Sequence, residues 1–279
     1  MANNKKIAQI LDGRVLAEKI KSDLHKKIAR LKKRPGLAAI LVGHDPASEL
    51  YIRLKEKACQ EVGINFHKYL YHRQGEPHIA EKELLKMINF LNKNDSIDGI
   101  LVQLPLPPGF KTQKIIEAIA KEKDVDGFNY PKVKITPPVI SAIIELLKSA
   151  PKPDYAHKNA LIIIKNNRFA RGLEIQLKNL GFKNISREKK IPDNSNDYEV
   201  IIIALGAPHA LKKSMIKKGA IIIDVGINKL GDKIVGDVEP KAAEAAGFIS
   251  PVPGGVGPLT VACLLRNTYL LYKKSIHKT

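Results

Sequence analysis

In the first half of the chain, hydrophobic residues alternate between helical spacing and short, nearly continuous apolar runs. The helical spacing predicts helices over residues 13–34, 46–62 and 79–92. The apolar runs predict strands over residues 37–43, 65–71 and 99–104. Helices and strands that alternate in this way indicate an α/β fold.

The alternation restarts after Pro137 with a helix and three more strands, expected over residues 160–164, 200–205 and 220–225. These strands are β-branched almost throughout, which is typical of a parallel sheet buried on both faces. Prolines interrupt the pattern within residues 130–138 and predict a domain boundary there. A last helix, over residues 259–274, is expected to return to the first domain.

Residues 251–260 contain three prolines and three glycines, which predicts a shaped loop that continues neither a helix nor a central strand. Such a loop offers bare peptide groups against which a planar ligand can lie. A tight connection between domains is the other interpretation, because isolated proline and glycine clusters often serve that purpose.

Asp45 and Pro46 predict a helix start, and Gly63 predicts its end. Within this helix, Tyr51 and Lys55 lie one turn apart on the same face, with Ser48 near the turn before them. Two interpretations of Lys55 stay open here. It is either a surface lysine beside an amphipathic tyrosine, or a lysine in a cleft whose lowered pKa allows proton exchange near neutrality.

Further polar residues lie at the end of the predicted strand over residues 99–104 and in the segment after it. Gln103 interrupts that apolar strand at its carboxyl end, so its amide needs a partner from either the neighbouring backbone or a ligand. Asp124 and Asp126 stand beside Gly127 and either cap a turn or face a ligand. Taken alone, the residues favour the turn.

Composition describes a globular protein, with 44% hydrophobic and 27% charged residues and no apolar run long enough for a membrane span. The net charge of +19 comes from lysines spread over almost every segment, and tryptophan is absent. This favours a solvated surface over a nucleic-acid site. Cys59 and Cys263 are far apart and unclustered, which argues against a disulfide and a metal site. The amino terminus lacks the apolar core of a secretory signal, so we expect a cytoplasmic protein.

Several ordered motifs resemble the bifunctional methylenetetrahydrofolate dehydrogenase/methenyltetrahydrofolate cyclohydrolase family over nearly the whole chain. They are Asp45-Pro-Ala-Ser48 with Tyr51-Ile-Arg-Leu-Lys55, Gly99-Ile-Leu-Val-Gln-Leu-Pro-Leu-Pro107, Lys123-Asp-Val-Asp-Gly-Phe128, Asp224-Val-Gly-Ile227, Gly236-Asp-Val238 and the segment 251–260. The resemblance implies a folate-binding catalytic α/β domain of residues 1–133 and 256–279. It implies a Rossmann-like, doubly wound parallel-sheet domain of residues 134–255 that binds NAD(P).

The resemblance also implies residue roles. Lys55 matches the proton-transfer group of the cyclohydrolase step, Gln103 tunes it, and Tyr51 stacks on the folate. Asp126 holds the pterin through charge-assisted bonds, whereas Asp124 is structural. The expected catalytic residues are Tyr51, Lys55, Gln103 and Asp126, and the expected substrate-binding residues are Ser48, Tyr51, Asp126, Pro253, Gly254 and Gly255.

The dinucleotide turn departs from the family pattern Gly-Arg-Ser-x-x-Val-Gly-x-Pro. Lys165 replaces the arginine expected at the extra phosphate of NADP, Asn166 replaces serine, and Ile164 stands at a glycine position. Lysine still pairs with phosphate, but it lacks the bidentate fork of arginine. A Cys-His-Ser turn is also missing further on, where Arg187 is a possible substitute. The expected cofactor-binding residues are Lys165, Asn166, Arg168, Ile227, Gly257 and Thr260.

We therefore expect NADP-dependent oxidation of 5,10-methylenetetrahydrofolate, followed by hydrolysis to 10-formyltetrahydrofolate. Alternatives are a cyclohydrolase with a degenerate dinucleotide site and a non-catalytic folate-binding relative. Tyr-x-x-x-Lys also occurs in short-chain dehydrogenases, but there it follows a glycine-rich nucleotide turn that is absent before Tyr51. Expected partners are tetrahydrofolate derivatives and a second copy of the chain, with no nucleic acid, membrane or metal.

Overall fold

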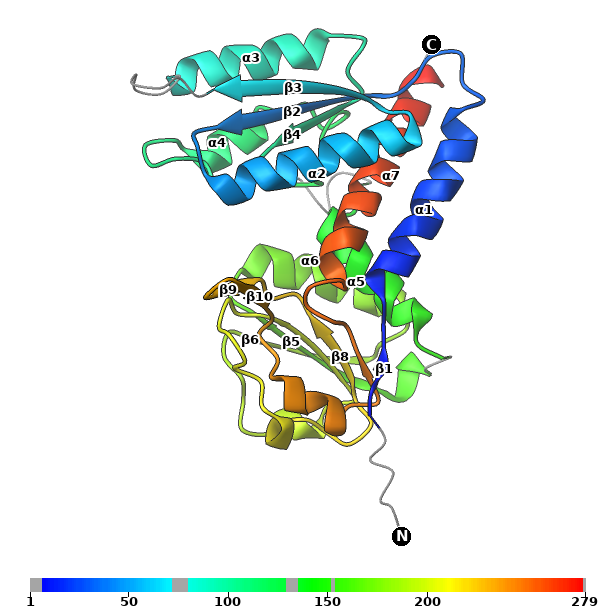
Figure 1. Cartoon of the computed structure of the whole chain (residues 1–279), viewed down its shortest axis with the longest axis vertical. Helices are drawn as coiled ribbons and strands as arrows, with labels where there is room; N and C mark the ends of the chain where they lie inside the picture. The colour runs from blue at the N-terminus through cyan, green and yellow to red at the C-terminus, as the bar shows by residue number, and fades with distance from the viewer. Residues whose placement is uncertain (1–6, 72–79, 129–134, 152–153, 278–279) are drawn as a thin grey trace. The chain divides into compact units, whose positions relative to one another are not determined.

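The computed structural model describes residues 7–71, 80–128, 135–151 and 154–277 of the chain. These residues form two compact units (Figure 1). Unit 1 comprises Met1–Ala17 and Val139–Thr260, and unit 2 comprises Glu18–Pro138 and Val261–Thr279. The expected start of a helix at Ile79 and the expected boundary between residues 133 and 134 lie outside the described residues.

Unit 2 is built on a three-stranded parallel sheet in the order β3-β2-β4. The strands are β2 (Gly36–Val42), β3 (Asn65–Tyr71) and β4 (Gly99–Val102). The helices are α2 (Pro46–Val62), α3 (Glu81–Lys93) and α4 (Thr112–Glu117), together with most of α1 (Gly13–Ile28) and the last part of α7 (Val256–Ile276).

The central strand β2 is buried along its whole length because both faces of the sheet are covered. Its odd-numbered residues from Leu37 to Leu41 enter a core shared with α1, α2 and α7. Its even-numbered residues from Ala38 to Val42 enter a second core with α3 and α4. This alternation follows from the two-residue period of a strand and explains the continuous apolar run in the sequence.

Helix α2 begins and ends where its capping residues predict. The Asp45 carboxylate accepts a hydrogen bond from Ser48 N at 2.8 Å, and Pro46 occupies the first helical turn. Gly63 has φ of 84° and donates its N–H to Cys59 O and Gln60 O. A residue with a Cβ adopts that left-handed conformation rarely, so glycine ends the helix here.

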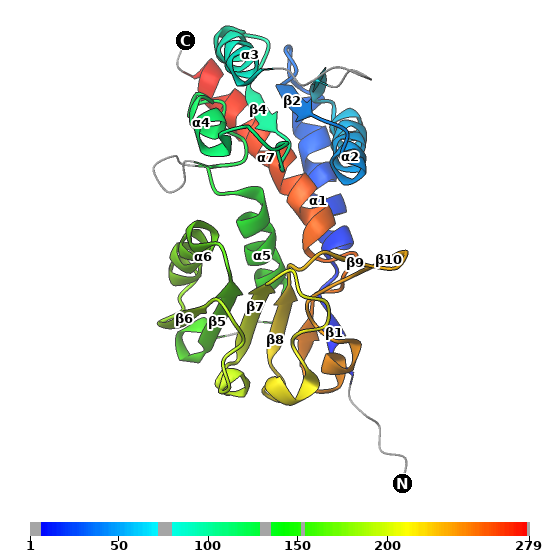
Figure 2. The ribbon, with the colours of Figure 1, turned by 90° about the vertical axis from the view of Figure 1, so that its left-hand side faces the viewer.

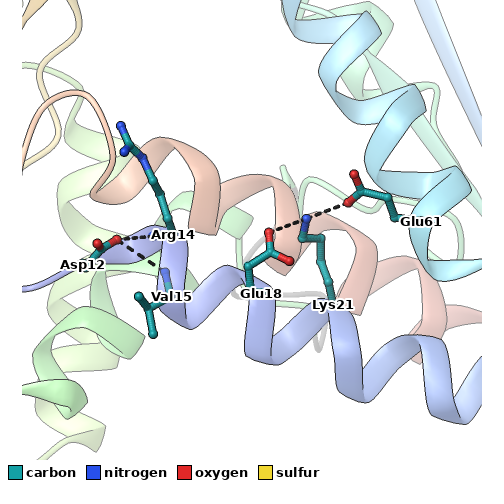
Figure 3. A network of polar contacts seen from close by, with 6 residues as sticks. All are labelled: Asp12, Arg14, Val15, Glu18, Lys21 and Glu61. Atoms are coloured by element: carbon teal, nitrogen blue, oxygen red, sulfur yellow. Dashed lines mark hydrogen bonds and ion pairs between the residues drawn. The ribbon is translucent and has the colours of Figure 1, made fainter.

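Helix α1 ends at Ile28 rather than near residue 34. Figure 3 shows the polar contacts along α1. Asp12 caps the helix by accepting from Arg14 N at 2.8 Å. Further along, within unit 2, the Lys21 amine lies 2.6 Å from both Glu18 and Glu61. Burial lowers the pKa of Lys21, but these two carboxylates outweigh it and raise the pKa above its ordinary value.

Unit 1 contains a six-stranded parallel sheet in the order β1-β11-β8-β7-β5-β6 (Figure 2). Its strands are β1 (Gln9–Ile10), β5 (Asn159–Ile164), β6 (Asn184–Glu188), β7 (Val200–Ala204), β8 (Ile221–Asp224) and β11 (Phe248–Ile249). Two helices, α5 (Pro138–Ser149) and α6 (Asn167–Asn179), and an antiparallel hairpin of β9 (Asn228–Leu230) and β10 (Lys233–Val235) complete the main elements. Short 3-10 helices cover Tyr155–His157, Ser195–Asp197, Lys213–Met215 and Pro240–Glu244.

The order of these strands creates a switch point between β5 and β7. From β5 the chain passes to β6 on one side, and it then returns to β7 on the other side of β5. Doubly wound sheets bind their ligands at such a point, beyond the carboxyl ends of the strands. A dinucleotide site in unit 1 is therefore expected at the turns after β5 and β7.

Two parts of the chain differ from expectation. The amino-terminal segment belongs to unit 1, whereas we placed it in the first domain, because β1 extends the unit 1 sheet by pairing with β11. The segment 251–260 is not a loop throughout, because α7 already begins at Val256. Pro258 is tolerated there since the first N–H groups of a helix have no partners within it.

The carboxyl-terminal part of α7 packs into unit 2, so the last helix returns to the first domain as expected. Asn267 is buried and donates its side-chain amide to Val125 O at 2.9 Å and to Thr136 O at 3.0 Å. Leu264, Leu265 and Leu271 join the core beneath β2. Among the described residues, no helix has both the length and the apolar composition that crossing a bilayer requires.

Candidate active site

Lys55 is the centre of the polar constellation in unit 2. It lies on α2, its side chain is partly buried, and its Nζ donates a hydrogen bond to Gln103 Oε1 at 2.7 Å. Tyr51, also partly buried, stands one helical turn before it. Of the two interpretations of Lys55, the structure supports the partly buried amine, because its hydrogen-bond partner is the almost fully buried amide of Gln103.

Gln103 is held from both ends of its amide group. It follows β4 and is only 9% exposed, so its polar atoms need partners. Oε1 accepts from Lys55, and Nε2 donates to Leu104 O at 2.8 Å. The contact with Leu104 fixes which end of the amide faces Lys55, and it thereby leaves an acceptor directed at the amine.

Burial pulls the charged groups of this constellation toward their neutral forms. It lowers the pKa of Lys55, although the charge of Asp126 opposes that shift. It also raises the pKa of Asp126 to about 6, with Lys55 opposing and Asp124 adding to the rise. One turn beyond Lys55, burial raises the pKa of the Cys59 thiol, so that thiol stays protonated. The site therefore holds an amine and a carboxyl group that both exchange protons more readily near neutrality than their exposed counterparts do.

The turn that carries Asp126 is tightly built. Asp124 and Val125 are fully buried, and Asp124 forms a parallel bridge with Ile100 beside β4. Gly127 has φ of 63°, and a Cβ there would lie 2.6 Å from Ile135 O. The structure thus places Asp124 within the fold, and it leaves Asp126 partly exposed next in the turn. Contact of Asp126 with a ligand stays a prediction.

The sequence predicts that Ser48 binds the substrate, but the structure shows that its hydroxyl already has a structural contact. It is 2% exposed, and its hydroxyl donates to the Asp45 carboxylate at 2.7 Å. This hydrogen bond reinforces the helix cap, so a role of Ser48 in substrate binding stays a prediction.

In unit 1, the segment before α7 is shaped by close backbone approaches. Gly254 has φ of 115°, and a Cβ on it would lie 2.9 Å from Arg14 Nε. Gly255 donates its N–H to Pro251 O at 2.8 Å, and a Cβ on Gly13 would lie 1.8 Å from Gly255 O. Pro253 is exposed beside these packed glycines. The segment is rigid, but its contact with a substrate stays a prediction.

Three of the expected cofactor residues lie in the turn between β5 and α6 and in the first turn of α6. Lys165 is exposed and donates its Nζ to Leu205 O at 2.7 Å, which links the turns after β5 and β7. Asn166 caps α6 by accepting from Arg168 N and Phe169 N, both at 3.0 Å. Asparagine and serine are both good capping residues, so the replacement at this position preserves the helix start.

The remaining expected cofactor residues are more scattered. Ile227 is 54% exposed after β8, which is unusual for a large apolar side chain that follows a buried strand. Gly257 has open space where a Cβ would stand, and the Thr260 hydroxyl donates to Val256 O of its own helix. Arg187 pairs with Glu174 of α6 at 3.1 Å, which ties β6 to that helix. Among the described residues, no group of three or more His, Cys, Asp and Glu side chains could hold a metal ion.

Comparison with known proteins agrees with this arrangement. Residues 11–126 match the model of the tetrahydrofolate dehydrogenase/cyclohydrolase catalytic domain, and residues 137–276 match the model of the NAD(P)-binding domain of the same family. The chain belongs to the tetrahydrofolate dehydrogenase/cyclohydrolase family.

Individual members of the family match over almost their whole length. A protein named bifunctional protein FolD 2 from Geobacter sulfurreducens is 41% identical, and the match covers 94% of this chain and 96% of that protein. The crystal structure of the bifunctional enzyme FolD from Campylobacter jejuni is 39% identical, with a TM-score of 0.89 over 96% of this chain and 99% of that one. FolD from Trypanosoma brucei, solved with NADP and an inhibitor, is 28% identical, with a TM-score of 0.87 over 97% and 99%.

These findings confirm three expectations: the family, the α/β fold with a Rossmann-like domain, and a dehydrogenase/cyclohydrolase that uses a nicotinamide dinucleotide. They do not test the roles of single residues. Sequence reasoning gave no role to Asp224 and Asp237, which the structure places as buried carboxylates at the end of β8 and just after β10. The signal that could have found them is the aspartate that ends one strand and the aspartate beside Gly236 after the hairpin.

Proposed function

We propose that this family member oxidises 5,10-methylenetetrahydrofolate with NADP and hydrolyses the methenyl product to 10-formyltetrahydrofolate. The main support for this proposal is the partly buried Lys55 amine, whose pKa is lowered by burial and whose position is fixed by a hydrogen bond to Gln103. A lysine in that state suits proton transfer at neutral pH, which the hydrolytic step requires.

The hydrolysis needs one water molecule and releases one proton. Water adds to the carbon of the methenyl cation and loses a proton, which gives a carbinol. The carbinol opens when one carbon–nitrogen bond breaks, its nitrogen takes up a proton, and its hydroxyl group loses a proton as the formyl carbonyl forms. This hydroxyl proton is the one released. Lys55 takes the first proton as the free amine and returns a proton to the leaving nitrogen as the ammonium. Gln103 keeps the amine oriented through Oε1 and prevents it from rotating toward solvent.

Two other side chains of unit 2 would hold the folate. Asp126, as a carboxylate, would accept hydrogen bonds from the amino group and ring nitrogens of the pterin. Tyr51 would stack its ring on an aromatic part of the substrate. Both are partly exposed, so each has surface left for a ligand.

The strand ends of unit 1 fit a dinucleotide. They lie at the switch point of the sheet, Lys165 provides an exposed cation, and Gly206 has open space above its Cα. Lys165 would pair with the extra phosphate of NADP, while Arg168 and Ile227 would line the same site. When it is bound, NADP supplies the acceptor for the hydride that leaves the methylene group.

One observation favours a second candidate, a cyclohydrolase that uses NADP weakly. Asn166 occupies two of the first-turn amides of α6, and Ile164 stands where the family pattern has glycine. Those amides are among the groups with which a helix start holds phosphate. In that case the hydrolytic rate would be normal and the oxidation rate very low.

Two further properties belong to the same proposal. We expect a cytoplasmic protein that forms a homodimer, as the resemblance implies. The dimer is tested by measuring the molar mass of the purified chain in solution by light scattering. A mass near 31 kDa, that of the single chain at 30.9 kDa, would contradict it.

The proposal is tested by replacing Lys55 with a residue of similar shape and no amine. Lys55→Met should lower the rate of methenyltetrahydrofolate hydrolysis by about a hundredfold to ten-thousandfold, as expected for the loss of a general base. Lys57→Met is the matched control, because Lys57 is exposed on the same helix. Equal rates of hydrolysis in the two variants would refute the role of Lys55, and absent NADP-dependent oxidation in the unaltered protein would select the second candidate.

A further inference from the structure

Unit 1 contains a pair of buried carboxylates that the proposed function does not use. Asp224 ends β8 and is 3% exposed, and Asp237 follows the β9–β10 hairpin and is fully buried. Burying a carboxylate costs much free energy unless it is well hydrogen-bonded. The donors that stabilise these two groups therefore show what the pair holds in place.

Asp237 binds the turn that follows β7. One of its oxygens accepts from Leu205 N and from Gly206 N, the latter at 3.1 Å. The other accepts from Ala207 N at 2.8 Å and from the Asn228 side-chain amide at 2.9 Å. Three successive backbone amides thus converge on one carboxylate, which fixes the path of the turn.

Asp224 binds the backbone on both sides of the β9–β10 hairpin. It accepts from Gly226 N at 2.9 Å, from Asp237 N at 3.1 Å and from Val238 N at 2.9 Å. The packing leaves no room for side chains at the two nearby glycines. A Cβ on Gly236 would lie 1.8 Å from Asp224 Oδ2, and one on Gly226 would lie 2.4 Å from Asp237 Cγ. The two carboxylates and the two glycines therefore interlock as one rigid group.

The two carboxylates and two glycines are linked by hydrogen bonds to the expected dinucleotide site at two points. Leu205, whose N–H is held by Asp237, offers its carbonyl oxygen to Lys165 Nζ. Ile227 stands between Gly226, whose N–H is held by Asp224, and Asn228, whose side chain is held by Asp237. An exposed cation and an exposed apolar side chain are thus both anchored through the same buried pair.

We propose that Asp237, supported by Asp224, is a positioning residue for the dinucleotide site, which rests on the NADP role of the proposed function. It acts through Leu205 on Lys165 and through Asn228 on Ile227, and it does not touch the cofactor. The benefit is preorganisation, because a turn already fixed in the free protein loses little conformational entropy when a ligand binds.

The test variant is Asp237→Asn, which keeps the shape of the side chain but directs an NH₂ group at backbone donors. We expect the Kd for NADP, measured by titration calorimetry, to rise about tenfold or more, because several charge-assisted hydrogen bonds are lost. The KM for NADP should rise likewise, while kcat at saturating NADP and the rate of methenyltetrahydrofolate hydrolysis should stay nearly constant. In the cofactor-free variant, amide hydrogen exchange at Leu205, Gly206 and Ala207 should become faster.

A control variant separates positioning from a general loss of stability. Glu199 accepts from Asn159 N at 2.8 Å at the opposite end of β5 and β7. Glu199→Gln should lower the stability of unit 1 and leave the Kd for NADP unchanged. If Asp237→Asn does not fold, Asn228→Ala replaces it, since it removes one donor and keeps the carboxylate, and its Kd should rise about threefold.

The outcomes are distinct. NADP binding by the unaltered protein is measured first, and its absence would reject the proposed oxidation rather than the positioning role. If the unaltered protein binds NADP, an unchanged Kd in the folded Asp237→Asn protein, or in Asn228→Ala where it replaces that variant, overturns the positioning role. An equal rise in Kd in Glu199→Gln overturns it too, because the effect would then follow stability alone.

Discussion

Both units place a carboxylate beside the end of a strand, but the two carboxylates differ in exposure and in partners. In unit 2, Asp126 is partly exposed and interacts with Lys55 through its charge, and its pKa is raised to about 6. In unit 1, Asp237 is fully buried and its oxygens accept from backbone amides of one turn. In the first arrangement, the side chains remain able to exchange protons with a substrate. In the second, the charged side chain holds the backbone of a turn in one conformation.

This difference separates two ways of building an active site. The reactive part needs perturbed pKa values and open polar atoms, so it depends on side chains such as Lys55 and Gln103. The cofactor part needs a backbone of fixed shape, so it depends on glycines and on carboxylates that are wholly occupied. We expect substitutions in unit 1 to act on stability and affinity, and substitutions in unit 2 to act on rates and their dependence on pH.

In unit 1, stability is the property that we expect to change most. Gly236→Ala places a Cβ 1.8 Å from an Asp224 oxygen that backbone amides hold in place. We expect the free energy of unfolding to fall by about 3 kcal/mol, because neither side of the contact can move freely. Urea denaturation followed by circular dichroism measures the change.

Gly257→Ala is the matched control for this prediction. A Cβ at Gly257 would meet no atom within 4 Å, and the residue lies in the first turn of α7. Its substitution should change the stability by no more than about 1 kcal/mol. An equal effect of the two substitutions would show that the interlocked carboxylates are not rigid.

The next effect is a pH dependence in unit 2. Burial raises the pKa of Asp126 to about 6, so the group loses its charge as the pH falls through that value. If its carboxylate holds the pterin, the KM for the folate should rise severalfold between about pH 7 and about pH 5. Steady-state hydrolysis rates across this range measure the KM, and kcat should follow a different profile.

Asp126→Asn sharpens this prediction because the amide does not titrate. The variant should have a higher KM at neutral pH, and that KM should no longer change between about pH 7 and about pH 5. A KM that rises in the variant as steeply as in the unaltered protein would assign the pH dependence to another group.

The smallest effect concerns Lys165. Lys165→Arg restores the bidentate fork that the family pattern has at this position, so the Kd for NADP should fall by a few fold. NAD lacks the extra phosphate, and its Kd should stay the same. Fluorescence titration with both dinucleotides measures the difference, and an equal change for both would place Lys165 away from that phosphate.

The sequence was a better guide to unit 2 than to unit 1. Helix α2 could be predicted to the residue because Asp45, Pro46 and Gly63 carry local capping signals. The 2.7 Å contact of Lys55 with Gln103 could be predicted only as an open choice, since it joins residues far apart in the chain. The prolines and glycines of segment 251–260 predict a loop, but α7 begins within this segment at Val256. A helix tolerates proline in its first turn, because the N–H groups there have no partners within the helix.

The positioning role of Asp237 could not be predicted, for a physical reason. Its partners are backbone amides, and these carry no signature in a sequence of side chains. The pairing of β1 with β11 was missed for a similar reason, because a two-residue strand is too short for a hydrophobic period. Features that depend on backbone groups, or on pairing between segments far apart in the chain, can be identified only from a structure.

The proposed hydrolysis depends on an amine of lowered pKa at Lys55, and the pH dependence of lysine labelling measures this property without any substrate. An amine-specific reagent is applied over a series of pH values, and mass spectrometry compares Lys55 with the exposed Lys57 on the same helix. The labelling of Lys55 should reach its midpoint at a lower pH than that of Lys57. A midpoint at the same pH or a higher one would contradict it.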